Sequence, residues 1–184
     1  MDFKTRPIDR KTLRFLAKII RKNLGIQTID FPVLKILEAI EFISNDSCNY
    51  VVESDELFST NVMAYIEYIE GMDKFSIHIK ESVYINAYKG DHSAIGFIMH
   101  EIAHYFLIDI LGLKPIDPLV SYSTGEIPSY LSAEWQAMAL SGELMIPYDE
   151  CYNMSFNEVY YLTKSSKKQT EYFFKNVLKK DITI

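Results

Sequence analysis

Residues 95–107 read Ile-Gly-Phe-Ile-Met-His-Glu-Ile-Ala-His-Tyr-Phe-Leu, an apolar run interrupted by two histidines and one glutamate. The length and apolar character of the surrounding segment predict a helix that packs in the core. On a helix, His100 and His104 lie four residues apart, about 40° from each other around the axis. Both imidazoles can therefore reach one point in space, as two ligands of a single metal ion must.

Glu101 lies beside this pair, where it can act as a base without taking a ligand position. The alternative interpretation is a core helix whose His and Glu side chains are buried without a metal. Unpaired, such burial would cost on the order of several kcal/mol, and coordination of a metal removes that conflict. Two imidazoles and a carboxylate base are the groups that metal-assisted hydrolysis of an amide requires.

The chain has 184 residues, of which 48% are hydrophobic, which is enough for one buried core and too few for two ordinary domains. We therefore expect a single domain over residues 1–184. Its expected parts are N-terminal helices over 1–45, a small sheet over 50–86, metal-site helices over 91–147 and a C-terminal helical pair over 155–180.

Several features favour a cytoplasmic location. No apolar stretch reaches the roughly 18 residues that a membrane span needs, and residues 1–7 are polar and lack the apolar core of a secretory signal. Cys48 and Cys151 have no CxxC spacing, which suits a reduced intracellular protein better than a disulfide scaffold. The sequence leaves a bridge between the two cysteines open.

Charge is distributed unevenly along the chain. Residues 1–22 carry a formal charge of +6, residues 23–163 carry −16, and residues 164–184 carry +4. One interpretation is that the basic ends neutralise the acidic middle, and the other is that the acidic body attracts a basic macromolecule. No continuous basic face is visible, so we expect no direct binding of nucleic acid.

Capping residues and hydrophobic periodicity predict the helices. Asp9 caps a helix over 10–23, Asp91 or Ser93 caps the helix of the histidine motif, which Gly112 ends, and Ser132 caps a helix over 133–145. A further helix runs from Pro32 to about residue 43, and capping boxes open two short helices at Ser155 and Ser166.

Residues 50–86 predict a sheet instead. Aromatic and β-branched residues indicate strands at 50–52, 62–69, 74–80 and 83–85. His78 falls on the polar, solvated face of the third strand. The connection 113–128 is irregular and of a length typical of functional lids. Together these patterns predict an α+β fold in which a small, mostly antiparallel sheet packs on helices.

A catalytic zinc ion usually has three protein ligands and one open position. Leu107 and Ile110 stand where a metzincin requires Gly and His, and no later histidine exists, so the third ligand should be a carboxylate. Asp109 lies off the face of the histidine pair. Glu134 is favoured because it begins a helix and has apolar neighbours for burial, and Glu143 is the second choice. The remaining candidates are Asp117, Glu126, Asp149 and Glu150.

The order of three segments resembles a known family. These are Ile85-Asn-Ala-Tyr-Lys-Gly-Asp91, the helix with His-Glu-Ile-Ala-His, and Glu134-Trp-Gln-Ala-Met-Ala-Leu-Ser-Gly-Glu-Leu-Met-Ile-Pro147. Over residues 30–175 they resemble the ImmA/IrrE-type metallopeptidases. Met138 and Leu140 depart from that family's pattern, which usually has Asn and Phe there. Gly96-Phe97-Ile98 also stands in place of the usual aromatic-Thr.

The resemblance implies a compact, gluzincin-like α+β domain with zinc bound by His100, His104 and Glu134, and with Glu101 as general base. Better-understood members of the family cut DNA-binding repressors of phage, mobile-element or stress genes. The resemblance therefore implies a protein substrate, a basic DNA-binding regulator.

We thus expect a zinc-dependent intracellular endopeptidase. The alternative is a non-catalytic, metal-stabilised regulator that binds and sequesters a partner, against which Glu101 argues because a structural metal site needs no base. Peptide hydrolysis also requires a donor that stabilises the oxyanion. The candidates are His92, Tyr105 and Tyr130.

Overall fold

A computed structural model describes residues 2, 4–69, 72–112 and 127–179. The described elements, in chain order, are α1 (Arg10–Asn23), α2 (Val33–Glu38), α3 (Ile40–Ile43), β1 (Cys48–Glu53), η1 (Asp55–Leu57), β2 (Ala64–Ile69), β3 (Lys74–Lys80), α4 (Glu81–Tyr88), α5 (His92–Leu111), η2 (Ser129–Leu131), α6 (Ala133–Met145), α7 (Tyr148–Cys151), α8 (Phe156–Thr163), α9 (Lys167–Tyr172) and the π-helical turn η3 (Phe173–Leu178).

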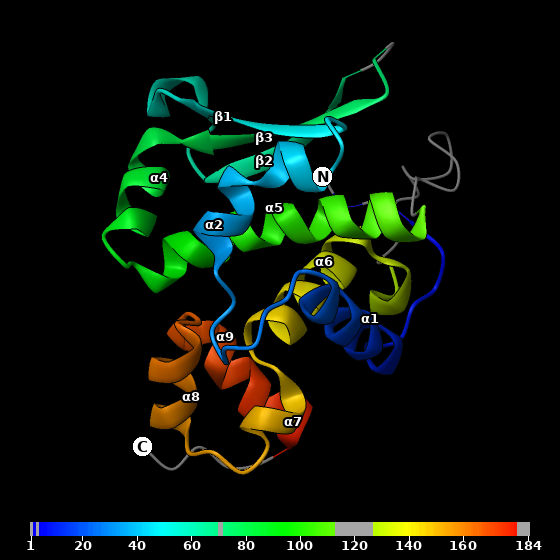
Figure 1. The fold of residues 1–184 in the computed structure, drawn as a ribbon, viewed down its shortest axis with the longest axis vertical. Helices are drawn as coiled ribbons and strands as arrows, with labels where there is room; N and C mark the ends of the chain where they lie inside the picture. Colours follow the sequence, from blue (N-terminus) through cyan, green and yellow to red (C-terminus); the bar gives the residue numbers. More distant parts are fainter. Residues whose placement is uncertain (1, 3, 70–71, 113–126, 180–184) are drawn as a thin grey trace.

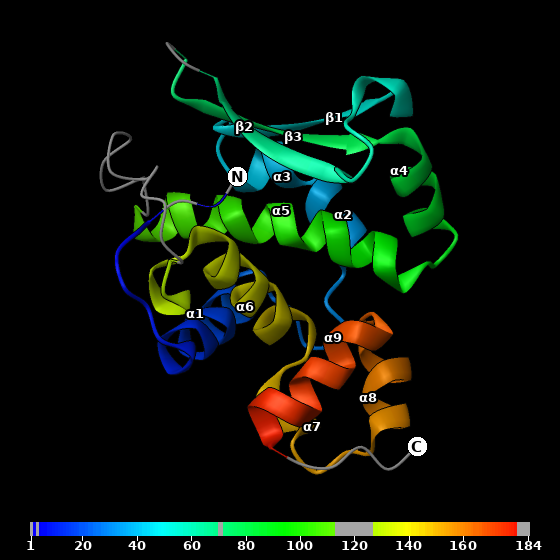
Figure 2. The same cartoon turned by 180° about the vertical axis from the view of Figure 1, so that it is seen from behind.

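Helix α5 crosses the middle of the molecule (Figure 1). The sheet lies on one side of it, and α1, α6 and the C-terminal helices lie on the other, as the reverse view also shows (Figure 2). The predicted α+β class is therefore confirmed. Ile98, Met99 and Ile102 of α5 are fully buried, so apolar contacts fix the orientation of this helix around its axis.

The sheet has three described strands in the order β1-β3-β2. β3 pairs in parallel with β1 and antiparallel with β2, so the sheet is mixed rather than mostly antiparallel as the sequence suggested. Ile77 and Ile79 of β3 face the helices and are fully buried. β2 is an edge strand of the sheet, and it contacts α5.

The three long helices have the ends that their caps predicted. Asp9 accepts a hydrogen bond from the Thr12 amide at 2.7 Å, and Asp91 accepts one from the Ala94 amide at 2.7 Å. Ser132 caps α6 in the same way, and Gly112 ends α5 with a left-handed φ of 59°. These capping signals agree with the burial pattern of the helices, and the predicted ends of the three helices are confirmed.

Two short predictions are wrong. Residues 83–85 form part of α4 instead of a strand, because Val83 and Ala87 lie on one helical face that packs into the core. The helix predicted over 32–43 is divided into α2 and α3 at Ala39, whose φ and ψ of −94° and 4° leave the helical region. In both segments tertiary packing overrides local propensity.

His78 is on the face of β3 opposite the helices, but it is not simply solvated. Its Nδ1 lies 2.8 Å from Glu53, its Nε2 lies 3.4 Å from Glu67, and its ring stacks on Tyr65 at 4.7 Å. The side chain is 15% exposed. His78 of the central strand therefore links both neighbouring strands.

Three further predictions concern membrane spanning, the two cysteines and the connection 113–128. α5 is long and apolar enough to cross a membrane, but 61% of its apolar window is buried inside the fold, as in the core helix of a soluble protein. Cys48 and Cys151 are both free and buried. Most of the predicted lid, residues 113–126, lies outside the described residues.

Candidate metal centre

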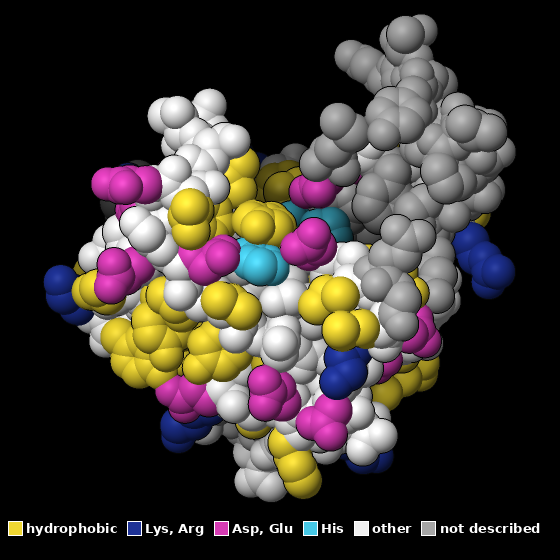
Figure 3. Space-filling model, turned by 90° about the horizontal axis from the view of Figure 1, so that it is seen from above, with side chains coloured by type: hydrophobic (Ala, Val, Ile, Leu, Met, Phe, Trp, Pro, Cys, Tyr) yellow, Lys and Arg dark blue, Asp and Glu magenta, His cyan; other side chains and the backbone are white. Residues whose placement is uncertain are grey.

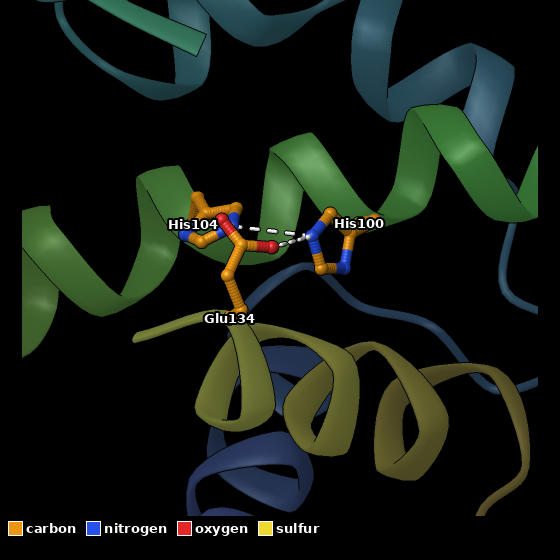
Figure 4. Close-up of side chains that lie close together, drawn as sticks. All are labelled: His100, His104 and Glu134. Carbon is orange, nitrogen blue, oxygen red and sulfur yellow. Dashed lines mark hydrogen bonds and ion pairs between the residues drawn. The ribbon is translucent and has the colours of Figure 1, made fainter. Parts of the chain in front are cut away.

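Two helices bring three potential ligands together (Figure 4). His100 and His104 project from successive turns of α5, and Glu134 projects toward them from the first turn of α6. The His100 Nε2 lies 3.1 Å from Glu134 Oε2 and 3.2 Å from the His104 Nε2. The His104 Nε2 lies 3.6 Å from Glu134 Oε1. Among the described residues, this is the group of ligand-bearing side chains that could hold a metal ion.

These separations fit a tetrahedral ion. Ligand atoms at about 2.0–2.1 Å from a tetrahedral zinc lie roughly 3.3–3.4 Å from one another. The three distances between the ligand atoms, 3.1 to 3.6 Å, bracket that value. Small side-chain movements would thus place all three donors around one ion, with the fourth direction available to another ligand.

The charges of the triad are coupled. Hydrogen bonds to His100 and His104 lower the pKa of the Glu134 carboxyl, and these outweigh its partial burial. Burial alone would lower the pKa of His100, but the bond to Glu134 and the nearby Glu101 raise it above 6.5 overall. The triad therefore holds one carboxylate that stays ionised beside an imidazole that readily takes a proton.

Glu101 lies next to the triad but is not one of its ligands. Its side chain is buried, at 8% exposed, yet it lines the same cavity as His100 and His104. Burial raises the pKa of Glu101 more than the two histidines lower it. The backbone amide of Ile66, on β2, also lowers this pKa, but by less than the histidines do. Glu101 is thus a buried carboxylate with raised proton affinity, a property that suits a general base.

The structure separates Glu134 from the other carboxylates considered. Glu143, the second choice, is 3% exposed and bonds Arg14 at 2.8 Å and Arg10 at 3.3 Å, away from the histidines. Asp149 pairs with Lys18 at the surface. Glu150 and Asp109 are exposed and stand outside the triad, and Asp117 and Glu126 lie outside the described residues.

The triad opens into a cavity of about 740 Å³ between α5 and β2. Pockets of this size hold small ligands or short peptide segments. Besides the metal-site residues, its lining includes Tyr65 and Glu67 of β2, and Asn61 just before it. No motif in the sequence marks these polar residues as part of a site. Only the contact of the predicted strand 62–69 with the histidine helix could have pointed to them.

None of the three predicted oxyanion donors is among the described residues that line this cavity. His92 bonds the Ser165 carbonyl at 3.1 Å, two turns before His100. The Tyr105 hydroxyl bonds Ser47 at 2.8 Å within the core. Tyr130 is half exposed, on η2. His92 and Tyr105 thus have structural partners elsewhere, and the prediction that one of the three serves the site is not supported.

Comparison with known proteins adds no family assignment: no family model matches the chain, and no curated protein matches its sequence. The likeness to the ImmA/IrrE-type peptidases therefore depends on the motifs alone. Met138, which departs from that pattern, is half exposed, whereas Leu140 is fully buried in the core.

We expect Glu134→Ala to lower affinity for Zn²⁺ by at least about tenfold, because it removes one of three ligands. Glu143→Ala should instead keep the metal and lose stability, since two arginines lose a buried partner. Glu143→Gln should lose less stability. Metal analysis and thermal unfolding of the metal-free proteins measure the two effects. Equal metal retention in both alanine variants would contradict the ligand assignment.

Metal binding should weaken as the pH falls. Zn²⁺ binds a neutral imidazole, and pairing with Glu134 raises the pKa of His100, so protons compete from above pH 6.5 downward. Affinity should fall progressively below that pKa, and the protonation of His100 alone should bring the fall close to tenfold per pH unit. Competition with a chelator of known pH dependence between pH 5.5 and 8 would measure it. A flat profile would mean that His100 is not a ligand.

Proposed function

We propose that the protein is a zinc-dependent endopeptidase of the cytoplasm that cleaves a specific protein substrate. Glu101 is the observation that carries this proposal. A buried carboxylate of raised pKa borders the same cavity as the ligand triad without belonging to it. A metal site that only stabilises a fold has no need of such a group, so its presence favours hydrolysis over a non-catalytic regulator that sequesters a partner.

The donor set supports zinc as the metal. Two imidazoles and one carboxylate, with a further position available, are typical of catalytic zinc sites. Held by His100, His104 and Glu134, a zinc ion would supply Lewis-acid polarisation of the scissile carbonyl and would lower the pKa of water in the site. Glu101 then accepts the proton of the attacking water and returns it to the leaving amine nitrogen.

The edge strand beside the triad supports a peptide as substrate. The Lys80 amide donates to the Met63 carbonyl at 3.2 Å, so these two residues form a hydrogen-bonded pair of the antiparallel ladder between β2 and β3. Hydrogen-bonded and non-hydrogen-bonded pairs alternate along such a ladder. The backbone groups of Ala64, Ile66 and Tyr68 therefore point away from β3. Extended peptides commonly bind along such an edge, and this edge borders the cavity that contains His100 and Glu101.

Charge supports a basic partner. The face seen in Figure 3 carries several acidic side chains, some of them next to histidines. Glu67 and Glu134 line the cavity, where the described lining residues include no Lys or Arg. An acidic surface speeds the encounter with a basic protein. Together with the resemblance described above, this favours a DNA-binding repressor of phage, mobile-element or stress genes as the substrate.

Glu101→Gln should separate a peptidase from a binding protein. Glutamine keeps the size of the side chain but cannot accept the proton, so cleavage should fall by about 10²–10⁴-fold while zinc and partner binding persist. Cleavage of a candidate repressor, and relief of repression in cells, are the measurements.

His100→Ala serves as the control, because it should lose metal and activity together. If Glu101→Gln relieves repression as well as the unmutated chain does, the protein acts by binding and the proposal is wrong.

Cleavage of the substrate should depend on salt. If the acidic surface attracts a basic partner, kcat/KM should fall severalfold between about 0.05 and 0.3 M salt, over which the Debye length shortens. The rate should be compared with digestion of casein, an acidic unfolded protein. Salt-independent cleavage, or equal digestion of casein, would contradict the proposed substrate class.

A further inference from the structure

A second cavity of about 470 Å³ adjoins the metal centre. It lies between α5, α6 and the segment formed by α9 and η3. His100 and Phe97 line both this cavity and the first one, so the two meet at the triad. In Figure 2, α9 runs beside α6 on the side of α5 away from the sheet. The metal centre therefore lies between two cavities, one next to the sheet and one next to the C-terminal helices.

The position of the second cavity follows from helix geometry. Gly96 lies one turn before His100 on α5, and Met138 lies one turn after Glu134 on α6. One turn is about 5.4 Å along each helix axis. The cavity is thus offset from the metal centre by a distance similar to the spacing of neighbouring residues in an extended peptide. A side chain at the residue next to the scissile bond could enter it.

Most of the surface that lines the second cavity is apolar, although Arg10, Lys168, Gln169 and serine side chains also border it. Glu143 is the acidic residue in it, and this carboxylate is already neutralised by Arg10 and Arg14. Met138 and Phe97 are 49% and 42% exposed, which places them at the mouth. The apolar side chains of the lining are Phe97, Met138, Ile146, Phe173 and Val177.

Two glycines make room for the second cavity. Gly96 and Gly142 both line it from the interior of helices, where glycine is less favourable than alanine. A Cβ at Gly96 would meet no atom within 4 Å, and one at Gly142 would meet only Gln169 Nε2 at 3.8 Å. Neither glycine is required for helix contact or by its backbone conformation. What they provide is open space beside His100.

We propose that this second cavity is a specificity pocket that receives a large apolar side chain, such as Leu, Met or Phe, from a bound peptide. The inference builds on the proposed peptidase function and names the substrate residue that the same site selects. Gly96 sets the depth of the pocket and Met138 borders its mouth. Preference for a large apolar side chain over alanine should be about ten- to a hundredfold, as for other apolar pockets.

The first test measures ligand binding in the pocket and does not depend on catalysis. The full chain, with the methionine methyl groups labelled for NMR, is titrated with the N-acetyl amides of alanine, leucine and phenylalanine. We expect the Met138 methyl signal to shift with the leucine and phenylalanine amides and not with the alanine amide. Gly96→Leu should abolish these shifts, because its side chain fills the pocket. Equal shifts in Gly96→Leu would overturn the proposal.

Two further variants show that the effect is local. Gly96→Ala should raise the melting temperature, because alanine favours the helix and meets no atom, and should weaken leucine and phenylalanine binding by severalfold. Asp109→Leu adds the same side chain at an exposed position of α5 and should leave the shifts unchanged. A loss of binding in Asp109→Leu equal to that in Gly96→Leu would also overturn the proposal.

The second test links the pocket to the metal. Hydroxamates carrying alanine, leucine or phenylalanine side chains are bound to the zinc-loaded chain and followed by calorimetry. The leucine and phenylalanine compounds should bind at least tenfold tighter than the alanine compound, and Gly96→Leu should remove this difference but keep zinc. Equal affinities for all three would overturn the pocket. A chain that takes up no zinc, yet shows the Met138 shifts, would instead overturn the peptidase proposal and leave the pocket established.

Discussion

Helix α5 meets two opposing requirements, because it is both the central core helix and the carrier of the polar groups of the site. Its residues Ile98, Met99 and Ile102 are fully buried in the core, which prevents the helix from rotating. Glu101 and His104 are nearly buried on the same helix, where unpaired polar groups would be costly. The cost is offset only if partners arrive from other elements.

Two elements outside α5 provide them. α6 presents Glu134 to both histidines, and Ile66 of β2 lines the same cavity as Glu101. Glu101 thus lies beside the strand that borders the first cavity, and the potential metal ligands lie beside the helix that borders the second cavity. A peptide lying along β2 would therefore be aligned with Glu101 through the same strand. Alignment of base and scissile bond is the main requirement of general-base catalysis.

The sequence predicted the parts of the molecule that local signals determine. Asp9, Asp91 and Ser132 cap the long helices where expected, and the spacing of His100 and His104 predicted their convergence on one point. Residues 83–85 were misassigned, because a three-residue β-branched and aromatic segment has no periodicity that separates strand from helix. The parallel pairing of β1 with β3 was also beyond the sequence, since the pattern of a short strand does not say which neighbour it pairs with.

The choice between Glu134 and Glu143 shows the same limit within the site. Both lie on α6 and both are followed by apolar residues, so local sequence ranks them only weakly. What separates them is α1, more than a hundred residues earlier, whose Arg10 and Arg14 engage Glu143. A long-range ion pair thus removes one candidate ligand, and no sequence pattern near residue 143 indicates that ion pair.

The position of Glu134 depends in turn on the first residues of the described chain. Asp2 accepts a hydrogen bond from the Glu134 amide at 3.2 Å. The fully buried Gln136 accepts from the Thr5 hydroxyl at 2.8 Å and donates to the Arg6 carbonyl at 2.9 Å. These bonds tie the first turn of α6 to the segment that leads into α1. Because α1 also binds Glu143 near the other end of α6, both ends of α6 are fixed to the N-terminal part of the chain. A third metal ligand that comes from a separate helix needs this bracing, since a shift of one ångström would move its carboxylate out of reach of the two histidines.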